Sequence, residues 1–359
     1  MAHSAKKIAA VIVALSTMLT AGCNSTSNTK TATSETSDAG ATRIVKDIDG
    51  TEVEVPQTVN RIADLWHANN QVVLLLGGAD KLVSTTQAIK GLPWFKTVYP
   101  KIDSIPAPVK GTDVNMEEML ATNPDVVLSS NDKQVEDARA AGVPTVKVDF
   151  QNFDNLKRTV EITADVIGTD EAKNRAQEFS AYLDKNLEMV QSKLADLSDS
   201  DKPRVLHIAG GDDLTKVDGS NSLIGEWMKA AGAQNSIDGV ANLKNITLEE
   251  IIQSNPDIII IGGTKSKEGI EQIKNDPAWA DVPAVQNNKL ISNPVGTFNW
   301  DRYSAEEALQ VLWAAKTFHE DKFQDIDLVS ETQQFYKKYY DYDLSAEEAN
   351  LILAGNPPQ

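Results

Sequence analysis

The sequence predicts an α/β protein of two similar lobes, each a small parallel sheet flanked by helices, joined by one long α-helix. Three observations support this prediction: a segment repeated in the two halves, β-branched runs separated by helical patterns, and a long amphipathic stretch between the halves. On this prediction residues 43–168 form an N-terminal lobe, residues 169–200 the connecting helix and residues 201–359 a C-terminal lobe.

The repeat consists of Val114–Val127 and Ile246–Ile259. Five of its fourteen positions are identical, and most of the others exchange like for like. Each copy predicts a short helix, a turn at Asn-Pro-Asp and a β-branched run that suits a buried parallel strand. We therefore expect two lobes of similar structure.

Short apolar runs predict the strands of both lobes. Helical patterns or loops separate these runs, as expected for parallel sheets covered by helices. The predicted strands are Arg61–Leu65, Leu82–Thr85, Val126–Ser129 and Thr145–Val148 in the first lobe, and Val205–Ala209, Ile258–Ile261 and Leu290–Ser292 in the second.

A long amphipathic segment lies between the lobes. Thr169 can cap it, and Asp170 and Glu171 suit the positive end of its dipole. Apolar residues then recur every three or four positions as far as Leu197, and Pro203 follows. Such a helix measures roughly 40 Å at 1.5 Å per residue, enough to cross between the lobes. We expect one helical crossing to permit only small lobe movements.

Residues 1–22 have the features of an export signal. Lys6 and Lys7 precede an apolar stretch from Ile8 to Leu19, and small residues lead up to Gly22. The apolar stretch is shorter than the about 20 residues that a membrane-spanning helix needs. We expect this segment to be cleaved after export.

Cys23 is the only cysteine, and the residues before it, from Leu19 to Gly22, resemble the bacterial lipobox. In a lipobox the cysteine is diacylated and becomes the new N-terminus, although Thr20 stands here where Leu is usual. A free cysteine beside an ordinary cleavage site is the alternative. Two acyl chains would hold the protein at the outer face of the cytoplasmic membrane, at a cell surface or in a periplasm. Residues 23–42 would form a flexible tether.

The composition is acidic, with 34 Lys and Arg against 52 Asp and Glu, a formal charge of −18. Loss of Lys6 and Lys7 with the signal, and of no acid, changes the charge to −20. A strongly acidic surface argues against nucleic acid as a partner and favours a soluble chain. We expect a monomer.

The ordered set of elements resembles the helix-linked class of ABC-importer binding proteins, whose members carry ferric siderophores, haem, cobalamin and other metal chelates. The resemblance covers nearly all of the mature chain, from Arg61–Leu65 through both repeats to Pro294–Arg302. The closing stretch, Phe335–Tyr340, is most similar to iron-complex binding proteins.

This resemblance implies a receptor with a ligand cleft between the lobes, which passes an iron chelate, a siderophore or a haem-like complex, to a separate permease and its ATPase. Cobalamin and a nickel or other metal chelate are the alternative ligands. No permanently bound cofactor is implied.

One acidic residue in each repeat is a candidate for permease docking. Thr247 and Glu250 predict a capping box, whereas Glu117 and Glu249, at the second helical position, are not needed to cap their helices. In the family, one exposed glutamate per lobe docks against arginines of the permease, and by motif position these are Glu117 and Glu249. The alternative is a solvated acid at the helix dipole.

Ligand contacts in two-lobed α/β proteins come from loops at the carboxyl ends of strands. Aromatic rings offer flat apolar contact, and Arg or Lys can meet an anionic chelate. For each candidate the alternative is packing within its lobe, and Arg302 could instead pair with Asp301 or Glu306. The candidates are Trp66, His67, Asn69, Trp94, Ser130, Lys265, Trp300, Arg302 and Tyr303.

The histidines bear on metal binding. His67, in a loop expected at the cleft, is the candidate for coordinating a metal through its chelate or for a hydrogen bond to it. His207 lies in a strand pattern and is expected in the core, and His319 is expected at the surface. A bare transition-metal ion usually needs three or four converging ligands, so one cleft histidine favours a preformed chelate.

Two other classes of protein are possible, an enzyme on a similar scaffold and an adhesion lipoprotein. The sequence has no phosphate-binding glycine loop before a helix, nucleophile elbow or metal-hydrolase spacing. The glycine pairs at residues 77–78, 210–211 and 262–263 fit loop turns. Two lobes facing a cleft favour a small ligand over an adhesion surface.

Overall fold

The computed structural model describes residues 40–359, which form one compact unit. The predicted signal peptide, Cys23 and the predicted tether as far as residue 39 lie outside the described residues. The described part opens with an antiparallel hairpin of β1 (Thr42–Lys46) and β2 (Glu52–Pro56). Across residues 40–359, no helix has both the length and the apolar character needed to cross a membrane.

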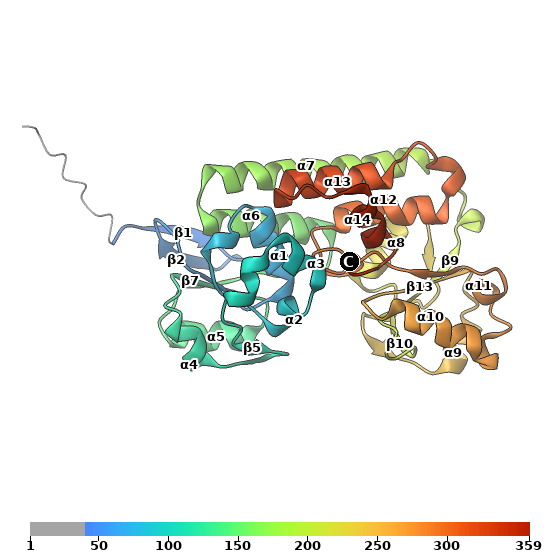
Figure 1. Ribbon diagram of the computed structural model, residues 1–359, viewed down its shortest axis with the longest axis horizontal. Coiled ribbons are helices and arrows are strands. Elements are labelled where there is room, and N and C mark those ends of the chain that lie inside the picture. The colour runs from blue at the N-terminus through green and yellow to red at the C-terminus, as the bar shows by residue number, and fades with distance from the viewer. Residues whose placement is uncertain (1–39) are drawn as a thin grey trace, which may run out of the picture. The chain divides into compact units, whose positions relative to one another are not determined.

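The first lobe is built on a parallel sheet in the order β4-β3-β7-β8. Figure 1 labels its strand β7. Its strands are largely buried, because helices and loops cover both faces of a parallel sheet. Each predicted strand of this lobe agrees with an observed one to within a residue at either end. The strands are β3 (Ile62–Asp64), β4 (Leu82–Ser84), β7 (Val126–Ser129) and β8 (Thr145–Lys147), with a small hairpin of β5 (Val109–Lys110) and β6 (Asp113–Val114).

Helices connect these strands and cover the sheet. They are α1 (His67–Leu75), α2 (Gln87–Lys90), α3 (Pro93–Val98), α4 (Met116–Ala121), α5 (Asp132–Ala140) and α6 (Phe153–Ile167).

The second lobe has a sheet in the order β12-β10-β9-β13-β14, with β11 pairing beside β9. The three predicted strands are present, and they run parallel to one another. However, β10 runs antiparallel to both β9 and β12. The loop from β9 to β10 is too short for the crossover that a parallel pair of these strands would require. The strands are β9 (Arg204–Ile208), β10 (Lys216–Asp218), β11 (Gln234–Asn235), β12 (Lys244–Asn245), β13 (Ile258–Ile261) and β14 (Leu290–Ser292).

The helices of the second half complete the fold. They are α8 (Leu223–Ala230), α9 (Leu248–Gln253), α10 (Ser266–Asn275), α11 (Pro283–Gln286), α12 (Glu307–Phe318), α13 (Leu328–Tyr340) and α14 (Ala346–Leu353).

The two copies of the sequence repeat form equivalent structures. The Asn115 side chain caps α4, and Thr247 forms the predicted capping box with Glu250 at α9. After each helix an asparagine, Asn123 or Asn255, turns the chain with φ of 45° or 48°. This left-handed conformation is tolerated by asparagine, so the Asn-Pro-Asp turn directs each chain into its buried strand, β7 or β13.

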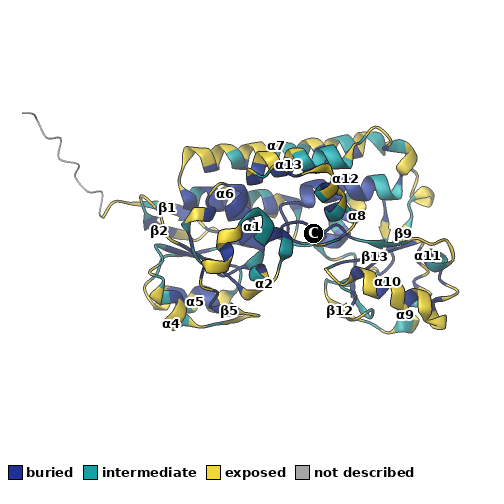
Figure 2. Cartoon of the chain, in the orientation of Figure 1, coloured by how far each residue is buried: buried dark blue, intermediate teal, exposed yellow. Residues whose placement is uncertain are grey.

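The long helix α7 (Asp170–Lys193) packs against α6 of the first lobe and against α12 and α8 of the second. Thr169 caps it, accepting a hydrogen bond from Ala172 N at 3.1 Å. It ends at Lys193, inside the predicted segment 169–200. Its outward face is exposed, whereas α12 beneath it is largely buried (Figure 2).

The C-terminal helices also connect the lobes. Helix α13 contacts both α1 and α12, and the Phe179 ring of α7 meets the Tyr339 ring of α13 at 6.1 Å. The indole Nε1 of Trp94 donates to Asn356 O at 2.8 Å, which ties the C-terminal segment to α3. One buried apolar cluster includes residues of both lobes and of α7. The lobes are therefore held together by several packed elements.

Candidate functional site

Three aromatic rings from both lobes gather where strands end. The Trp66 ring, after β3, lies 5.2 Å from the Phe150 ring, after β8, and 6.1 Å from the Tyr303 ring of the second lobe. The Phe150 and Tyr303 rings lie 6.0 Å apart, and all three pairs meet edge to face. We call Trp66, Phe150 and Tyr303 the aromatic cluster. Trp66 is 7% exposed, Phe150 is fully buried and Tyr303 is half-buried. The cluster is therefore a largely buried contact between the lobes, at the carboxyl ends of the first-lobe strands, where ligands of α/β proteins bind.

His67 lies beside this cluster, at the start of α1. Its ring stacks on the Phe298 ring of the second lobe, with centroids 5.5 Å apart and planes 25° from parallel. Burial lowers the pKa of His67 below its usual value, so the imidazole is neutral at pH 7. Across residues 40–359, no three or more His, Cys, Asp or Glu residues are grouped so that they could hold a metal ion.

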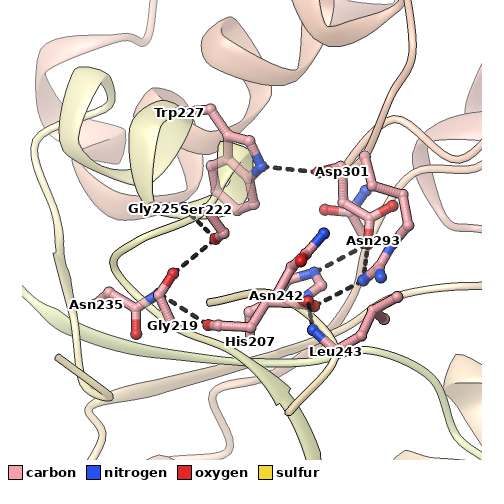
Figure 3. Close-up of polar contacts among 12 residues, drawn as sticks. His207, Gly219, Ser222, Gly225, Trp227, Asn235, Asn242, Leu243, Asn293 and Asp301 are labelled. Atoms are coloured by element: carbon pink, nitrogen blue, oxygen red, sulfur yellow. Dashed lines mark hydrogen bonds and ion pairs between the residues drawn. The ribbon is translucent and has the colours of Figure 1, made fainter. Parts of the chain in front are cut away.

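A group of ionisable side chains in the second lobe adjoins Tyr303. Arg302 Nη2 donates to Asp218 Oδ2 at 2.8 Å and to Asp301 Oδ2 at 3.1 Å. Figure 3 labels His207 and Asp301 of this group. His207 Nδ1 lies 2.8 Å from Asp218 Oδ2, and its Nε2 lies 3.0 Å from Asp301 Oδ2. The second of these contacts is an ion pair without good hydrogen-bond alignment. We call His207, Asp218, Asp301 and Arg302 the charged cluster.

Opposite charges offset one another in the charged cluster. Burial alone would lower the pKa of His207, but the two carboxylates outweigh burial and raise it. Burial would likewise raise the pKa values of Asp218 and Asp301, but Arg302 and His207 hold both below the usual value. Arg302 pairs with Asp301, as one sequence alternative predicted, and the two carboxylates compensate its positive charge.

A buried polar network attaches the segment that carries Phe298 and Tyr303 to the first lobe. Gln71 of α1 donates from Nε2 to Thr297 Oγ1 at 2.8 Å and to Glu306 Oε2 at 2.9 Å. Its Oε1 accepts from Ala305 N at 2.8 Å. Burial raises the pKa of Glu306 to about 7, although hydrogen bonds, the largest from Tyr336, act in the opposite direction. The network fixes the position of the second-lobe loop relative to α1.

Several residues predicted at the site are fully buried and pack within the protein. Asn69 donates to Asp64 Oδ2 and accepts from Thr163, and Trp94 bonds to the C-terminal segment. Trp300 is fully buried within the apolar core that includes both lobes. These side chains support the site from within.

Ser130 and Lys265 lie at the ends of first- and second-lobe strands, as expected. Ser130 is half-buried after β7, and Lys265 is exposed before α10, where it pairs with Asp212 at 3.2 Å. His207 is buried, as predicted. The prediction that His319 lies at the surface is wrong: it is 7% exposed and its Nε2 lies 3.0 Å from Gly232 O, because the helix end that carries it packs on the second lobe.

Glu117 and Glu249 occupy equivalent positions, each the second residue of its helix, α4 or α9. Both side chains belong to exposed residues. Glu249 Oε1 accepts a hydrogen bond from Gln253 within the same helix at 3.1 Å. The lobes thus present one exposed glutamate each at matching sites of the repeat.

Sequence reasoning missed four residues that the structure brings to this region. Phe150 follows β8 and could have been found by the same rule that selected Trp66. Asp218, Asn242 and Leu243 had no such signal. Asp218 ends β10, and Asn242 and Leu243 precede β12, and neither strand was predicted. Asn242 Nδ2 donates to Tyr303 Oη at 2.6 Å, and Leu243 N donates to Asp218 Oδ1 at 2.8 Å.

The sequence comparisons concern most of the chain. The family described as periplasmic binding protein matches residues 62–294. The molybdate-binding protein MolA of Haemophilus influenzae is 26% identical over 329 residues, which cover 84% of this chain and 91% of the relative. The Fe(3+)-citrate-binding protein YfmC of Bacillus subtilis is 23% identical over 312 residues, covering 84% of this chain and 93% of the relative.

Solved structures share the fold. A periplasmic solute binding protein of Veillonella parvula has a TM-score of 0.77 at 23% identity, covering 87% of this chain and 97% of that one. The molybdate-bound structure of MolA has a TM-score of 0.76 at 24% identity, covering 84% and 99%. At this level of identity the structural likeness extends to the fold alone.

Proposed function

The chain belongs to the periplasmic binding protein family, as an extracytoplasmic substrate-binding protein of an ABC importer and not an enzyme, and from this premise we propose that it captures an iron chelate between its lobes. The chelate, a siderophore or haem-like complex, is the transported cargo, and no permanent cofactor is proposed. Delivery to the permease and its ATPase, a lipid anchor at Cys23 and a monomeric state are parts of the same proposal.

The observation that carries the proposal is the aromatic cluster, which joins the two lobes. Trp66 and Phe150 come from the first lobe and the half-buried Tyr303 from the second, so a ligand that binds beside Tyr303 lies where the lobes meet. Aromatic side chains at such a place suit a chelate whose organic shell encloses the metal. His67 adds a neutral nitrogen that can accept a hydrogen bond or reach the metal.

The charge of the site also favours a chelate. The Arg302 guanidinium is balanced by Asp218 and Asp301, and His67 is neutral. A compact dianion needs strong uncompensated positive charge or many donors once it leaves water. A chelate spreads its charge over a larger surface and therefore needs less positive charge and fewer donors from the protein. The Fe(3+)-citrate-binding relative is consistent with such a ligand.

The second candidate is molybdate, because the relative named for molybdate binding matches 84% of this chain at 26% identity. Cobalamin and a nickel or other metal chelate are further alternatives that would use the same surface.

Titration of the protein from residue 24 onward, followed by tryptophan fluorescence, tests the proposal. The probes are ferric desferrioxamine B, haemin, ferric citrate and sodium molybdate. We expect saturable quenching by at least one ferric chelate and none by molybdate, since Trp66 lies at the proposed site. Saturation by molybdate alone would overturn the iron-chelate proposal.

Variants test whether the fluorescence quenching arises at the proposed ligand site. Trp66→Phe keeps an aromatic ring but removes the indole, so the quenching should fall. Trp279→Phe is the matched control, because Trp279 is also buried but belongs to a separate apolar cluster of the second lobe. In His67→Ala, a changed absorption band of the bound ferric chelate would indicate that His67 coordinates the metal. An unchanged band would show that His67 does not coordinate it.

A further inference from the structure

Backbone strain in the described residues is concentrated at one place. In residues 40–359, the non-glycine residues with positive φ are Asn123, Leu243, Asn255, Asn288, Tyr303 and Asp341. The Asn and Asp residues of this set tolerate the left-handed region, whereas bulky side chains do not. The other two members are Leu243, with φ of 52°, and Tyr303, with φ of 50°. Both belong to the region of the aromatic and charged clusters.

Leu243 is held in this conformation by the charged cluster. Its backbone N donates to Asp218 Oδ1 at 2.8 Å, and the other oxygen of the same carboxylate accepts from Arg302 at 2.8 Å. The preceding residue, Asn242, donates from Nδ2 to Tyr303 Oη at 2.6 Å. The two strained residues are thus connected through Asn242, and both depend on the site for their conformation.

The Leu243 side chain is also unusually exposed. It is 43% exposed, and in the described part of the chain the other large hydrophobic residue with such exposure is Ile44, at 57%, in the hairpin of β1 and β2. An apolar side chain in water, on a strained backbone, stabilises nothing in the unliganded protein. Strain of this kind persists where it serves binding.

We propose that Asn242 and Leu243 form a specificity-determining wall of the ligand site, in which Leu243 covers apolar surface of the bound chelate and Asn242 positions Tyr303. This inference rests on the proposed function, because it takes the ligand to bind at the aromatic cluster. It deepens that function by defining the cargo: a chelate with an apolar outer surface next to Leu243.

Leu243→Gly separates a ligand contact from a structural role. Glycine adopts φ of 52° without strain and keeps the amide that bonds Asp218, so the variant should unfold at the same or a higher temperature. Loss of the side chain should weaken binding of ferric desferrioxamine B or haemin by about five-fold to ten-fold, the effect of losing part of a leucine contact. Leu243→Asn, which tolerates the backbone but is polar, should weaken binding to a similar extent.

Two matched controls accompany these variants. Asn288→Gly relaxes a positive φ of 55° outside the site, and Ile44→Ser removes an exposed aliphatic side chain from the hairpin. Both should bind with wild-type affinity. Wild-type affinity in Leu243→Gly and Leu243→Asn, or a lower unfolding temperature with unchanged affinity, would overturn the assignment of Leu243.

The positioning role of Asn242 is tested by a double-mutant cycle with Tyr303. If Asn242 acts through the Tyr303 hydroxyl, Asn242→Ala, Tyr303→Phe and the double variant should lose the same affinity. Additive losses would overturn this role. The two proposals fail in different ways. If the wild-type protein binds only sodium molybdate, the iron-chelate proposal fails and the role of Leu243 fails with it. If the wild type binds a ferric chelate and the Leu243 variants bind it equally well, only the role of Leu243 fails.

Discussion

Arg302 donates from Nη2 to Asp218 Oδ2 at 2.8 Å, and this contact joins the loop after β14 to the end of β10. The Arg302 side chain is 11% exposed and the Asp218 side chain is fully buried. The residue that the sequence offered as a ligand contact is therefore also the cation that compensates two buried carboxylates. Its loss would affect stability before it affected affinity.

Arg302→Ala should lower the free energy of unfolding by about 3–5 kcal/mol, the cost of leaving a buried charge without its partner. Urea denaturation at neutral pH measures this. Arg302→Lys keeps the charge but loses the planar fork that meets both carboxylates, so its loss should be smaller. If Arg302 also contacts an anionic ligand oxygen, affinity of folded Arg302→Lys should fall about ten-fold or more. An alanine variant as stable as the wild type would contradict the structural role.

Glu306 should make stability depend on pH. Burial raises its pKa from 4.5 to about 7. Between these values the native state binds a proton that the unfolded state has released, so this contribution is fully present below pH 4.5 and is lost as the pH rises through about 7. Each unit of raised pKa corresponds to about 1.4 kcal/mol.

Glu306→Gln removes this titration, so its free energy of unfolding should change less between about pH 4.5 and pH 7 than that of the wild type. Urea denaturation across this range is the measurement. Asp64 and Glu307 are also buried carboxyls with raised pKa values, so part of the slope should remain. An identical slope in both proteins would show that Glu306 does not titrate in this range.

Charge reversal at both repeat glutamates, Glu117→Arg with Glu249→Arg, should abolish uptake of a ferric chelate by cells while affinity stays within a few-fold. The reason is that both residues lie on exposed helix starts outside the site. Glu347→Arg is the matched control, since Glu347 is the exposed second residue of α14. Normal uptake by the well-expressed double variant would show that these residues do not dock against the permease.

Ligand binding should change the shape of the protein little. Helix α7 packs on both lobes, α13 contacts α1, and Gln71 bonds Thr297, Ala305 and Glu306 across the lobes. Small-angle scattering with and without ferric desferrioxamine B should give nearly the same radius of gyration. A decrease typical of hinge closure would show that these contacts break on binding.

Cys23 should be the anchored N-terminus of the mature protein. Cys23→Ala should leave the precursor uncleaved or release the protein from the membrane, because the proposed lipid anchor requires this thiol. Membrane fractionation and intact mass in the native host measure the outcome, with His319→Gln as a variant that should fractionate as the wild type does. Identical mass and fractionation for Cys23→Ala would rule the anchor out.

The sequence alone predicted the strands of the parallel core to within a residue, both copies of the repeat and the caps at Thr169 and Thr247. These features are local. A β-branched run, a cap residue with its amide three positions away and an Asn-Pro-Asp turn each act over a few neighbouring positions. Charge and composition likewise needed no structure.

Tertiary structure decided which candidates reach the site. Trp66, Trp94 and Trp300 are all buried, and their neighbours distinguish them. The Trp66 ring meets Phe150 and Tyr303, whereas Trp94 bonds to Asn356 at the C-terminal end. Arg302 is neutralised by Asp218, 84 positions away, and Leu243 is positioned by the same carboxylate. Burial and charge compensation depend on which distant segments pack together, so no local sequence pattern predicts them.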